Sequence, residues 1–438
     1  MKTVYTPAKS KRILIVDDDA MVASAYKSKF ESERYRVEIV STGERALQLL
    51  ETERFDLVLL DFSMPGMNGA EVLKTIRSQP GAEAVSVVVF ANFYLPGVLQ
   101  VASESGATRC VRKGSCTPGD MLKVVRELLA RGHVASRNAE PGAIPSRIET
   151  ISDSETEYQK KLIADFLACV PQRLGRMRLN HHALVNGERE DIRLAEFGEM
   201  RRQARLLAGA AGIAGFRKIA QLVSALEALF IRLSAKPANT TPSVIRTIGQ
   251  AVDLLSAALD QAARPEVQVP VSPSILVVDD EIISRQAICS ALEKAELRAV
   301  SVDDPMVAQG MLEKTHFDLI FLDVEMPIQN GLDLCASIRK MPTNQATPVV
   351  FVTAHSDFEN RAQSVLSRGN DFIEKPFLPV ELAVKALILL LKEELRPIST
   401  VDHNKIDQSE ELEAAPADTK RACENETHPP NAALAGKS

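Results

Sequence analysis

Two stretches of this chain repeat one another, and the repeat constrains the fold more than any other feature. Residues 12–19, RILIVDDD, return as SILVVDDE at residues 274–281. Residues 55–65, FDLVLLDFSMP, return as FDLIFLDVEMP at residues 317–327. Both pairs are separated by 262 positions, and three charged residues keep the same step: Asp17 to Asp279, Asp61 to Asp323 and Lys113 to Lys375. We therefore expect two copies of one domain of about 120 residues, at residues 10–132 and 274–395.

Each copy alternates short apolar runs with amphipathic stretches at helical spacing. In the second copy the apolar runs cover residues 275–279, 297–301, 318–323, 348–353 and 370–374. Helical periodicity follows them, as at residues 283–295 and 356–367. Five strands alternating with helices predict an α/β fold with a parallel sheet that is covered on both faces. In such sheets ligands bind beyond the carboxyl ends of the strands, where the repeated charged residues lie.

The segments outside the two copies differ in composition. Residues 133–154 and 263–273 contain Gly, Pro and Ser without periodicity and predict linkers. Residues 155–262 show helix-period apolar spacing, rich in Ala and Leu, with breaks at Asn186-Gly187 and Lys236-Pro237. Four helices fit this segment, and an all-α four-helix bundle would bury their apolar stripes. Residues 396–438 are polar and acidic, which predicts a disordered tail.

Composition narrows the function classes. The 58 acidic and 52 basic residues leave a net charge of −6, which argues against a protein that binds nucleic acid mainly by neutralising phosphates. We expect no membrane partner, because no apolar run approaches the roughly 20 residues that span a bilayer. The first twelve residues lack the apolar core of a signal peptide, and the 6 cysteines form no CxxC pair. These features predict a reduced, cytoplasmic protein.

Three carboxylates are expected to meet at the sheet edge of the second copy. Asp279, Asp280 and Asp323 follow neighbouring strands, and unpaired like charges would repel one another. A bound Mg²⁺ ion would resolve this conflict and suit a phosphate substrate. A carboxylate can attack phosphorus to form an aspartyl-phosphate, while Lys375 and the Thr353 hydroxyl would contact the phosphoryl oxygens. The first copy carries the corresponding residues Asp17, Asp18, Asp61 and Lys113.

At these motifs both copies resemble receiver domains of two-component response regulators. The shared motifs are the paired acids, the lone Asp, Met-Pro followed by Asn-Gly, and the lysine; the second copy adds Thr-Ala and Lys-Pro-Phe. The resemblance implies flavodoxin-like (βα)5 domains that take phosphate from a partner's phosphohistidine onto Asp323 and Asp61. It also implies that Mg²⁺ is held by Asp279, Asp280 and Asp323 in the second copy, and by Asp17, Asp18 and Asp61 in the first. Lys375 and Lys113 match the phosphate-side lysine.

The two copies differ in the residues that the resemblance assigns to switching. In the family, a hydroxyl moves toward the phosphoryl group and an aromatic ring turns inward. The second copy has Thr353 and Phe372 for these roles, whereas the first has Ala91 and Cys110. Gly114 also follows Lys113 where the second copy has a proline. We expect Asp61 to accept phosphate but to propagate the signal poorly.

The middle segment resembles a histidine phosphotransfer domain that has lost its histidine. Residues 200–215 match the central helix of that family, with Arg205 at the phosphoacceptor position and Ala208 at the lysine position. Arginine is always protonated and non-nucleophilic, so we expect no transfer chemistry. His181 and His182 lie off the expected position, and we interpret them as ordinary solvated or half-buried residues, with a displaced phosphoacceptor as the alternative. The basic stretch around Arg205 could contact an acidic receiver face or simply be a solvated helix face.

We therefore predict a signalling protein rather than an enzyme, with a histidine kinase or phosphotransfer protein upstream and a protein partner downstream. One alternative is an Asp-nucleophile phosphatase of the haloacid dehalogenase type, since Glu325 lies two residues after Asp323, although Ser63 replaces it in the first copy. A transcriptional regulator is a second alternative, but no basic helix-turn-helix pattern follows either copy. A histidine kinase would need a Gly-rich nucleotide-binding module, which we do not find. The sequence leaves the cognate kinase, the pathway and the oligomeric state open.

Overall fold

The computed structural model describes residues 10–79, 85–92, 94, 97–130, 153–186, 190–262, 273–354 and 371–395. Met1–Leu395 cluster into one unit, and Arg396–Ser438, the predicted tail, lie outside the described residues. The predicted linkers, at residues 133–154 and 263–273, and the helical pattern at residues 356–367 lie almost entirely outside them as well. Within the described residues, no helix combines the length and the apolar character needed to cross a membrane.

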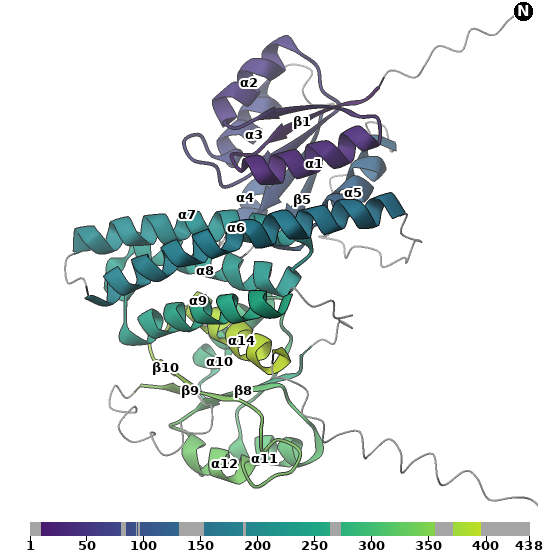
Figure 1. The fold of residues 1–438 in the computed structure, drawn as a ribbon. Helices are drawn as coiled ribbons and strands as arrows, with labels where there is room; N and C mark the ends of the chain where they lie inside the picture. Colours follow the sequence, from purple (N-terminus) through teal and green to yellow (C-terminus); the bar gives the residue numbers. More distant parts are fainter. Residues whose placement is uncertain are drawn as a thin grey trace, which may run out of the picture. The chain divides into compact units, whose positions relative to one another are not determined.

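The first repeat folds into a parallel sheet with helices around it (Figure 1). Its five strands have the order β2-β1-β3-β4-β5. Its strands are β1 (Arg12–Val16), β2 (Arg36–Val40), β3 (Leu57–Asp61), β4 (Ser86–Ala91) and β5 (Arg109–Arg112). The helices are α1 (Ala20–Ser32), α2 (Gly43–Thr52), α3 (Gly69–Ser78), α4 (Val98–Glu104) and α5 (Pro118–Ala130), with a 3-10 turn η2 (Lys113–Ser115) after β5.

Both faces of this sheet are covered, which explains the continuous apolar strands. Ile13 and Ile15 of β1 pack in one cluster with Tyr26 and Phe30 of α1. The alternate residues of β1, such as Leu14, pack on the opposite face in a cluster with α2, α3 and α4. Since successive strand residues point to opposite faces, a strand buried on both faces must be apolar at every position.

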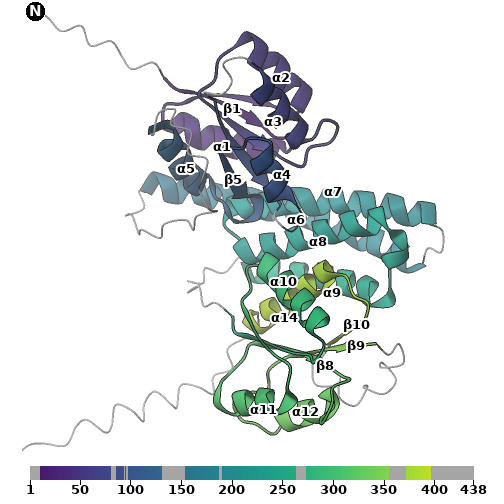
Figure 2. The same ribbon diagram turned by 180° about the vertical axis from the view of Figure 1, so that it is seen from behind.

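The second repeat has the same topology, with strand order β7-β6-β8-β9-β10 when read from the equivalent edge. Its strands are β6 (Ile275–Val278), β7 (Ala299–Val302), β8 (Leu319–Asp323), β9 (Val349–Thr353) and β10 (Asp371–Glu374). The described helices are α10 (Ile282–Lys294), α11 (Pro305–Lys314), α12 (Gly331–Ile338) and α14 (Pro379–Glu394). Figure 2 shows α11 and α12 on one face of this sheet and α10 and α14 on the other.

The strand predicted at residues 297–301 begins two residues later, at Ala299. The reason is the end of α10. Glu296 adopts a left-handed conformation with φ of 58°, and the amide of Leu297 donates back to the carbonyl of Leu292 at 2.9 Å. These two residues therefore close the helix before the chain becomes extended.

A bundle of four helices follows the first sheet in the chain: α6 (Asp153–Asn186), α7 (Glu190–Ala214), α8 (Arg217–Ala235) and α9 (Pro242–Ala262), with a 3-10 turn η3 (Pro237–Asn239) between the last two. Helix α6 begins two residues before the predicted start of the bundle. Gly215 separates α7 from α8 with φ of +89°, a conformation that side chains rarely adopt. The fold class is thus confirmed: two flavodoxin-like α/β domains flank an all-α bundle.

The bundle contacts both repeats. Helix α7 packs against η2 and α1, and α8 and α9 pack against α14. In the second contact, the Ser243 hydroxyl of α9 donates a 2.6 Å hydrogen bond to Glu381 of α14, and both residues are buried. The bundle core is therefore continuous with that of the second repeat.

Candidate functional site

The carboxylates converge because of strand topology. Strands β1 and β3 are neighbours, so Asp17, which follows β1, lies beside Asp61, the last residue of β3. Strands β6 and β8 bring Asp279 and Asp323 together in the same way. In each repeat the carboxylate oxygens of three acids lie within 4.8 Å of one another: Asp17, Asp18 and Asp61 in the first, Asp279, Asp280 and Asp323 in the second.

The second acid cluster is organised around Lys375, which follows β10. Its Nζ donates to Asp323 Oδ2 at 2.8 Å and to Asp279 Oδ2 at 3.1 Å. The hydroxyl of Ser284 on α10 also donates to Asp279. Burial raises the pKa of Asp323, and the Lys375 ammonium offsets part of this effect. Asp279 and Asp323 are buried, whereas Asp280 is exposed, so solvent reaches this cluster from one side.

Thr353 and Phe372 lie on the two strands beside this cluster. Thr353 ends β9 and is fully buried, and its carbonyl accepts a 2.7 Å hydrogen bond from the amide of Lys375. Phe372 lies on β10, and the guanidinium of Arg246 from α9 lies 4.5 Å from its ring centroid. Phe372, the aromatic residue to which the family resemblance assigns a switching role, is thus in direct contact with the bundle.

The first acid cluster contains the same lysine cradle. Lys113 Nζ donates to Asp61 Oδ2 at 2.8 Å and to Asp17 Oδ2 at 2.9 Å. The Ser63 amide donates to Asp61 Oδ1 at 3.0 Å. Asp19 accepts hydrogen bonds from the first amides of α1, which explains why this third acid of the DDD run points away from the cluster.

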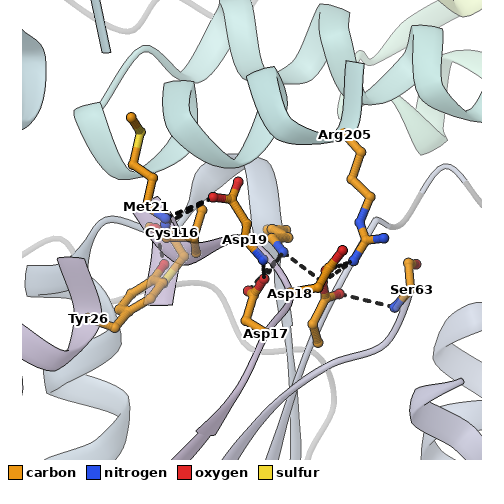
Figure 3. A network of polar contacts seen from close by, with 11 residues as sticks. Asp17, Asp18, Asp19, Met21, Tyr26, Ser63, Cys116 and Arg205 are labelled. Atoms are coloured by element: carbon orange, nitrogen blue, oxygen red, sulfur yellow. Dashed lines mark hydrogen bonds and ion pairs between the residues drawn. The ribbon is translucent and has the colours of Figure 1, made fainter. Parts of the chain in front are cut away.

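A second cation enters the first cluster from the bundle. Arg205 of α7 donates from Nη2 to Asp61 Oδ2 at 2.7 Å and to Asp18 Oδ1 (Figure 3). The side chain of Arg205 is only 13% exposed. Burial alone would raise the pKa of Asp61, but Lys113 and Arg205 outweigh it and lower this pKa to about 2. Burial raises the pKa of Asp17 to about 7, although Lys113 partly opposes the shift. The two cations therefore favour the ionised form of Asp61.

Buried polar residues close the space around Asp61. Asn92, the residue after β4, donates from Nδ2 to Glu227 Oε2 at 2.7 Å and to the Ser224 carbonyl at 2.9 Å. Burial raises the pKa of Glu227, and the hydrogen bond from Asn92 opposes that shift. The cavity that remains beside Asp61, Lys113 and Arg205 measures about 10 Å³, which is room for one water molecule at most.

Comparison with known proteins decides the family. The response regulator receiver domain family matches residues 13–126 and 275–387, about half of the chain. The chain belongs to the response regulator receiver domain family. The two repeats are its receiver domains, and the acid clusters lie at their strand ends.

Several known proteins are similar to part of this chain. The transcriptional regulatory protein ResD of Bacillus subtilis is 35% identical over 118 residues, which cover 26% of this chain and 47% of ResD. The phosphate regulon transcriptional regulatory protein PhoB of Escherichia coli K12 is 30% identical over 142 residues, covering 32% of this chain and 60% of PhoB. A CheY-like receiver domain protein from Methanospirillum hungatei is 31% identical, covers 28% of this chain and 96% of its own, and has a TM-score of 0.26. The chain thus spans about half the length of ResD and PhoB.

The two receiver domains differ in how well they suit a divalent cation. Oxygen ligands of the kind that Mg²⁺ prefers are present in both. In the second receiver the exposed Asp280 leaves one side of the cluster open, and the residues fit the ion. In the first receiver Arg205 holds Asp18 and Asp61, and Lys113 holds Asp17 and Asp61, so each of the three carboxylates already has a cationic partner. This arrangement does not fit Mg²⁺ while Arg205 is in place.

Sequence reasoning placed the acids and lysines together but missed part of the site. It left open whether Arg205 meets a receiver face, and it did not include Asn92, Ser284 or Arg246. One signal was available for Arg205, because it lies in a basic stretch with Arg201 and Arg202 that could contact an acidic receiver face. His181 is half-buried, with Nε2 at 3.0 Å from the Ile245 carbonyl, on the side of the bundle formed by α6 and α9.

Proposed function

We propose that this chain is a two-component signalling protein whose second receiver domain accepts a phosphoryl group on Asp323. The observation that carries the proposal is the contact of Lys375 Nζ with Asp323 and Asp279, 2.8 and 3.1 Å away, beside the exposed Asp280 and the buried Thr353. The donor would be the phosphohistidine of a partner histidine kinase or phosphotransfer protein. The protein would act in the cytoplasm and signal by protein contact rather than by turning over a small molecule.

The residues of the second receiver suit phosphoryl transfer. A carboxylate oxygen of Asp323 would form the new bond to phosphorus while the bond from phosphorus to the donor imidazole nitrogen breaks. Lys375 already lies on Asp323 and would balance the charge of the phosphoryl oxygens, and the Thr353 hydroxyl could donate to one of them. Mg²⁺ held by Asp279, Asp280 and Asp323 would supply further positive charge at the transferred group.

The bundle would receive the signal from this receiver. Arg246 lies over the Phe372 ring, and Glu381 of α14 accepts hydrogen bonds from Ser243 and Thr247 of α9. An inward turn of Phe372, as the family resemblance implies, would remove its ring from Arg246. We propose that this contact converts the state of Asp323 into a change at α9, which a downstream protein then reads.

The bundle itself is proposed to be a phosphotransfer-like module without transfer chemistry. Its Arg205 stands where that family has histidine, and a guanidinium does not form a phosphoramidate relay at neutral pH because it stays protonated. Helix α7 keeps the small residues Gly209 and Gly212 of the motif, which lie against the first receiver. The module would then serve as a binding surface rather than as a carrier of phosphate.

Acetyl phosphate with Mg²⁺, followed by intact-mass measurement, tests the proposed acceptor. We expect one phosphoryl adduct on the wild type and on Asp61→Asn, and none on Asp323→Asn. Calorimetry with Mg²⁺ and BeF₃⁻ on the same proteins gives a second readout that needs no phosphodonor. Loss of both signals from the intact second receiver would overturn the proposal. Asp323-dependent, repeated release of phosphate from a phosphate ester would favour the phosphatase alternative instead.

A further inference from the structure

The first receiver domain carries a cation from another domain inside its acid pocket. We propose that Arg205 is the resident cation of this pocket, that its guanidinium takes the place of a divalent ion, and that α7 is thereby a built-in ligand that closes Asp61 to phosphodonors. This inference rests on the proposed function, because it assumes that an unoccupied acid pocket of this family would take Mg²⁺ and phosphate.

Charge balance is the first argument. Each pocket gathers three carboxylates around one lysine. In the first pocket Arg205 adds a second cation, which contacts both Asp61 and Asp18. The counterpart of Asp18 in the second receiver, Asp280, is exposed. The guanidinium has several N–H donors in one plane and can contact two carboxylates at once. Arg205 therefore supplies positive charge to two of the three carboxylates that would hold a metal ion.

Space is the second argument. With Arg205 in place, the cavity beside Asp61 measures about 10 Å³, too small for a phosphoryl donor. Ala208, which matches the lysine position of the phosphotransfer motif, also lines this cavity. A longer side chain at this position would compete with Arg205 for the same space. A phosphodonor could reach Asp61 only after α7 moved away.

The close approach of α7 is the third argument. A Cβ at Gly212 would lie 2.6 Å from the Lys113 carbonyl oxygen, and a Cβ at Gly209 would lie 2.9 Å from Val22 Cγ2. The glycines thus allow the helix backbone to reach η2 and α1. The buried hydrogen bonds from Asn92 to Glu227 and to Ser224 hold α8 against the same receiver. Arg205 is therefore positioned by two helices and not by its own ion pairs alone.

The test measures binding of Mg²⁺ with BeF₃⁻ to full-length chains that carry Asp323→Asn, so that only the first receiver can respond. Isothermal calorimetry would compare this background with the same chain carrying Arg205→Ala or Arg205→Gln. The control is Arg202→Ala, because Arg202 lies one turn away and is paired with Glu199 of its own helix. Arg205→Gln keeps a polar side chain and provides a second test if the alanine variant does not fold. Circular dichroism checks that every variant is folded.

We expect both Arg205 variants to bind Mg²⁺ with BeF₃⁻ at least about tenfold more tightly than the Asp323→Asn chain that keeps Arg205. In that chain only the fraction of molecules with Arg205 out of the pocket can bind the ligand, and the apparent affinity falls by this fraction. Adding Asp61→Asn should abolish the gain, and Arg202→Ala should leave the affinity unchanged. Equal affinity with and without Arg205, or an equal gain from Arg202→Ala, would overturn the inference. The proposed function fails separately, through loss of Asp323 labelling in chains that keep Arg205.

Discussion

Arg205 and Asp61 are 144 residues apart in the chain, yet the guanidinium Nη2 and the carboxylate Oδ2 lie 2.7 Å apart. Asp61 is buried and the Arg205 side chain is only 13% exposed, so solvent screens their attraction weakly. In the second receiver, among the described residues, Lys375 is the cation that pairs with the equivalent Asp323. The two receiver domains therefore have the same fold and the same arrangement of acids. They differ in Arg205, the cation that the bundle adds to the first.

The Asn92–Glu227 hydrogen bond should contribute measurably to stability. Asn92→Ala would remove the donor to the buried Glu227 carboxylate, and we expect a loss of about 1–3 kcal/mol in the free energy of unfolding. Glu227→Gln in the same chain should recover part of this loss, because an amide costs less to bury than a carboxylate. Urea denaturation of the two single variants and the double variant measures the coupling. Strictly additive effects would contradict a direct interaction.

Two glycines of α7 provide a matched pair of substitutions. Gly212→Ala would place a Cβ 2.6 Å from the Lys113 carbonyl oxygen, and we expect a loss of about 1–3 kcal/mol through overpacking. Gly198→Ala, in the same helix, meets nothing within 4 Å and should stabilise the chain by about 0.5–1 kcal/mol. Thermal melts of both variants check the prediction. Similar shifts from the two changes would show that α7 does not need its close approach to the first receiver.

Arg246 should couple the second receiver to the bundle. In the wild type, binding of Mg²⁺ with BeF₃⁻ should change hydrogen exchange in α9, because the proposed turn of Phe372 would break the contact that its ring makes with Arg246. We expect Arg246→Ala to reduce this response while affinity for the ligand stays within about twofold, since the cation–π contact is weak and lies outside the acid cluster. Arg232→Ala on α8 is the control. An unaltered α9 response in Arg246→Ala would rule out this route.

Glu381 should make stability depend on pH. Burial raises its pKa above the usual 4.5, with hydrogen bonds from Ser243 opposing the shift. The folded chain therefore holds the proton more tightly, and this contribution is complete below the unfolded pKa and is lost as pH rises through the folded one. Glu381→Gln should therefore gain stability relative to the wild type as the pH rises above the usual carboxyl pKa of 4.5. Melting temperatures of the wild type and Glu381→Gln, measured from acidic to neutral pH, test this difference, and Glu51→Gln at an exposed position is the control. Curves of melting temperature against pH that stay parallel for the wild type and Glu381→Gln would contradict the prediction.

The repeat and the strand pattern were sufficient to predict the acid clusters. Neighbouring parallel strands end at the same edge of a sheet. Asp279 follows one such strand and Asp323 ends its neighbour, so the two acids can be placed together without knowing any side-chain contact. Lys375 follows the same logic through the last strand. The end of α10 was less predictable, because Glu296 adopts its left-handed conformation only once the helix is capped.

Repeats, motifs and residue spacing were enough to predict the two receiver domains, their acids and lysines, and the helical segment between them. The contacts of Arg205 could be found only from the folded chain, since its partners Asp18 and Asp61 lie in another domain. Local spacing predicts helices and strands because those depend on near neighbours. The approach of α7 to the first receiver depends instead on Gly209 and Gly212 meeting Val22 and the Lys113 carbonyl, contacts between segments that no local pattern connects.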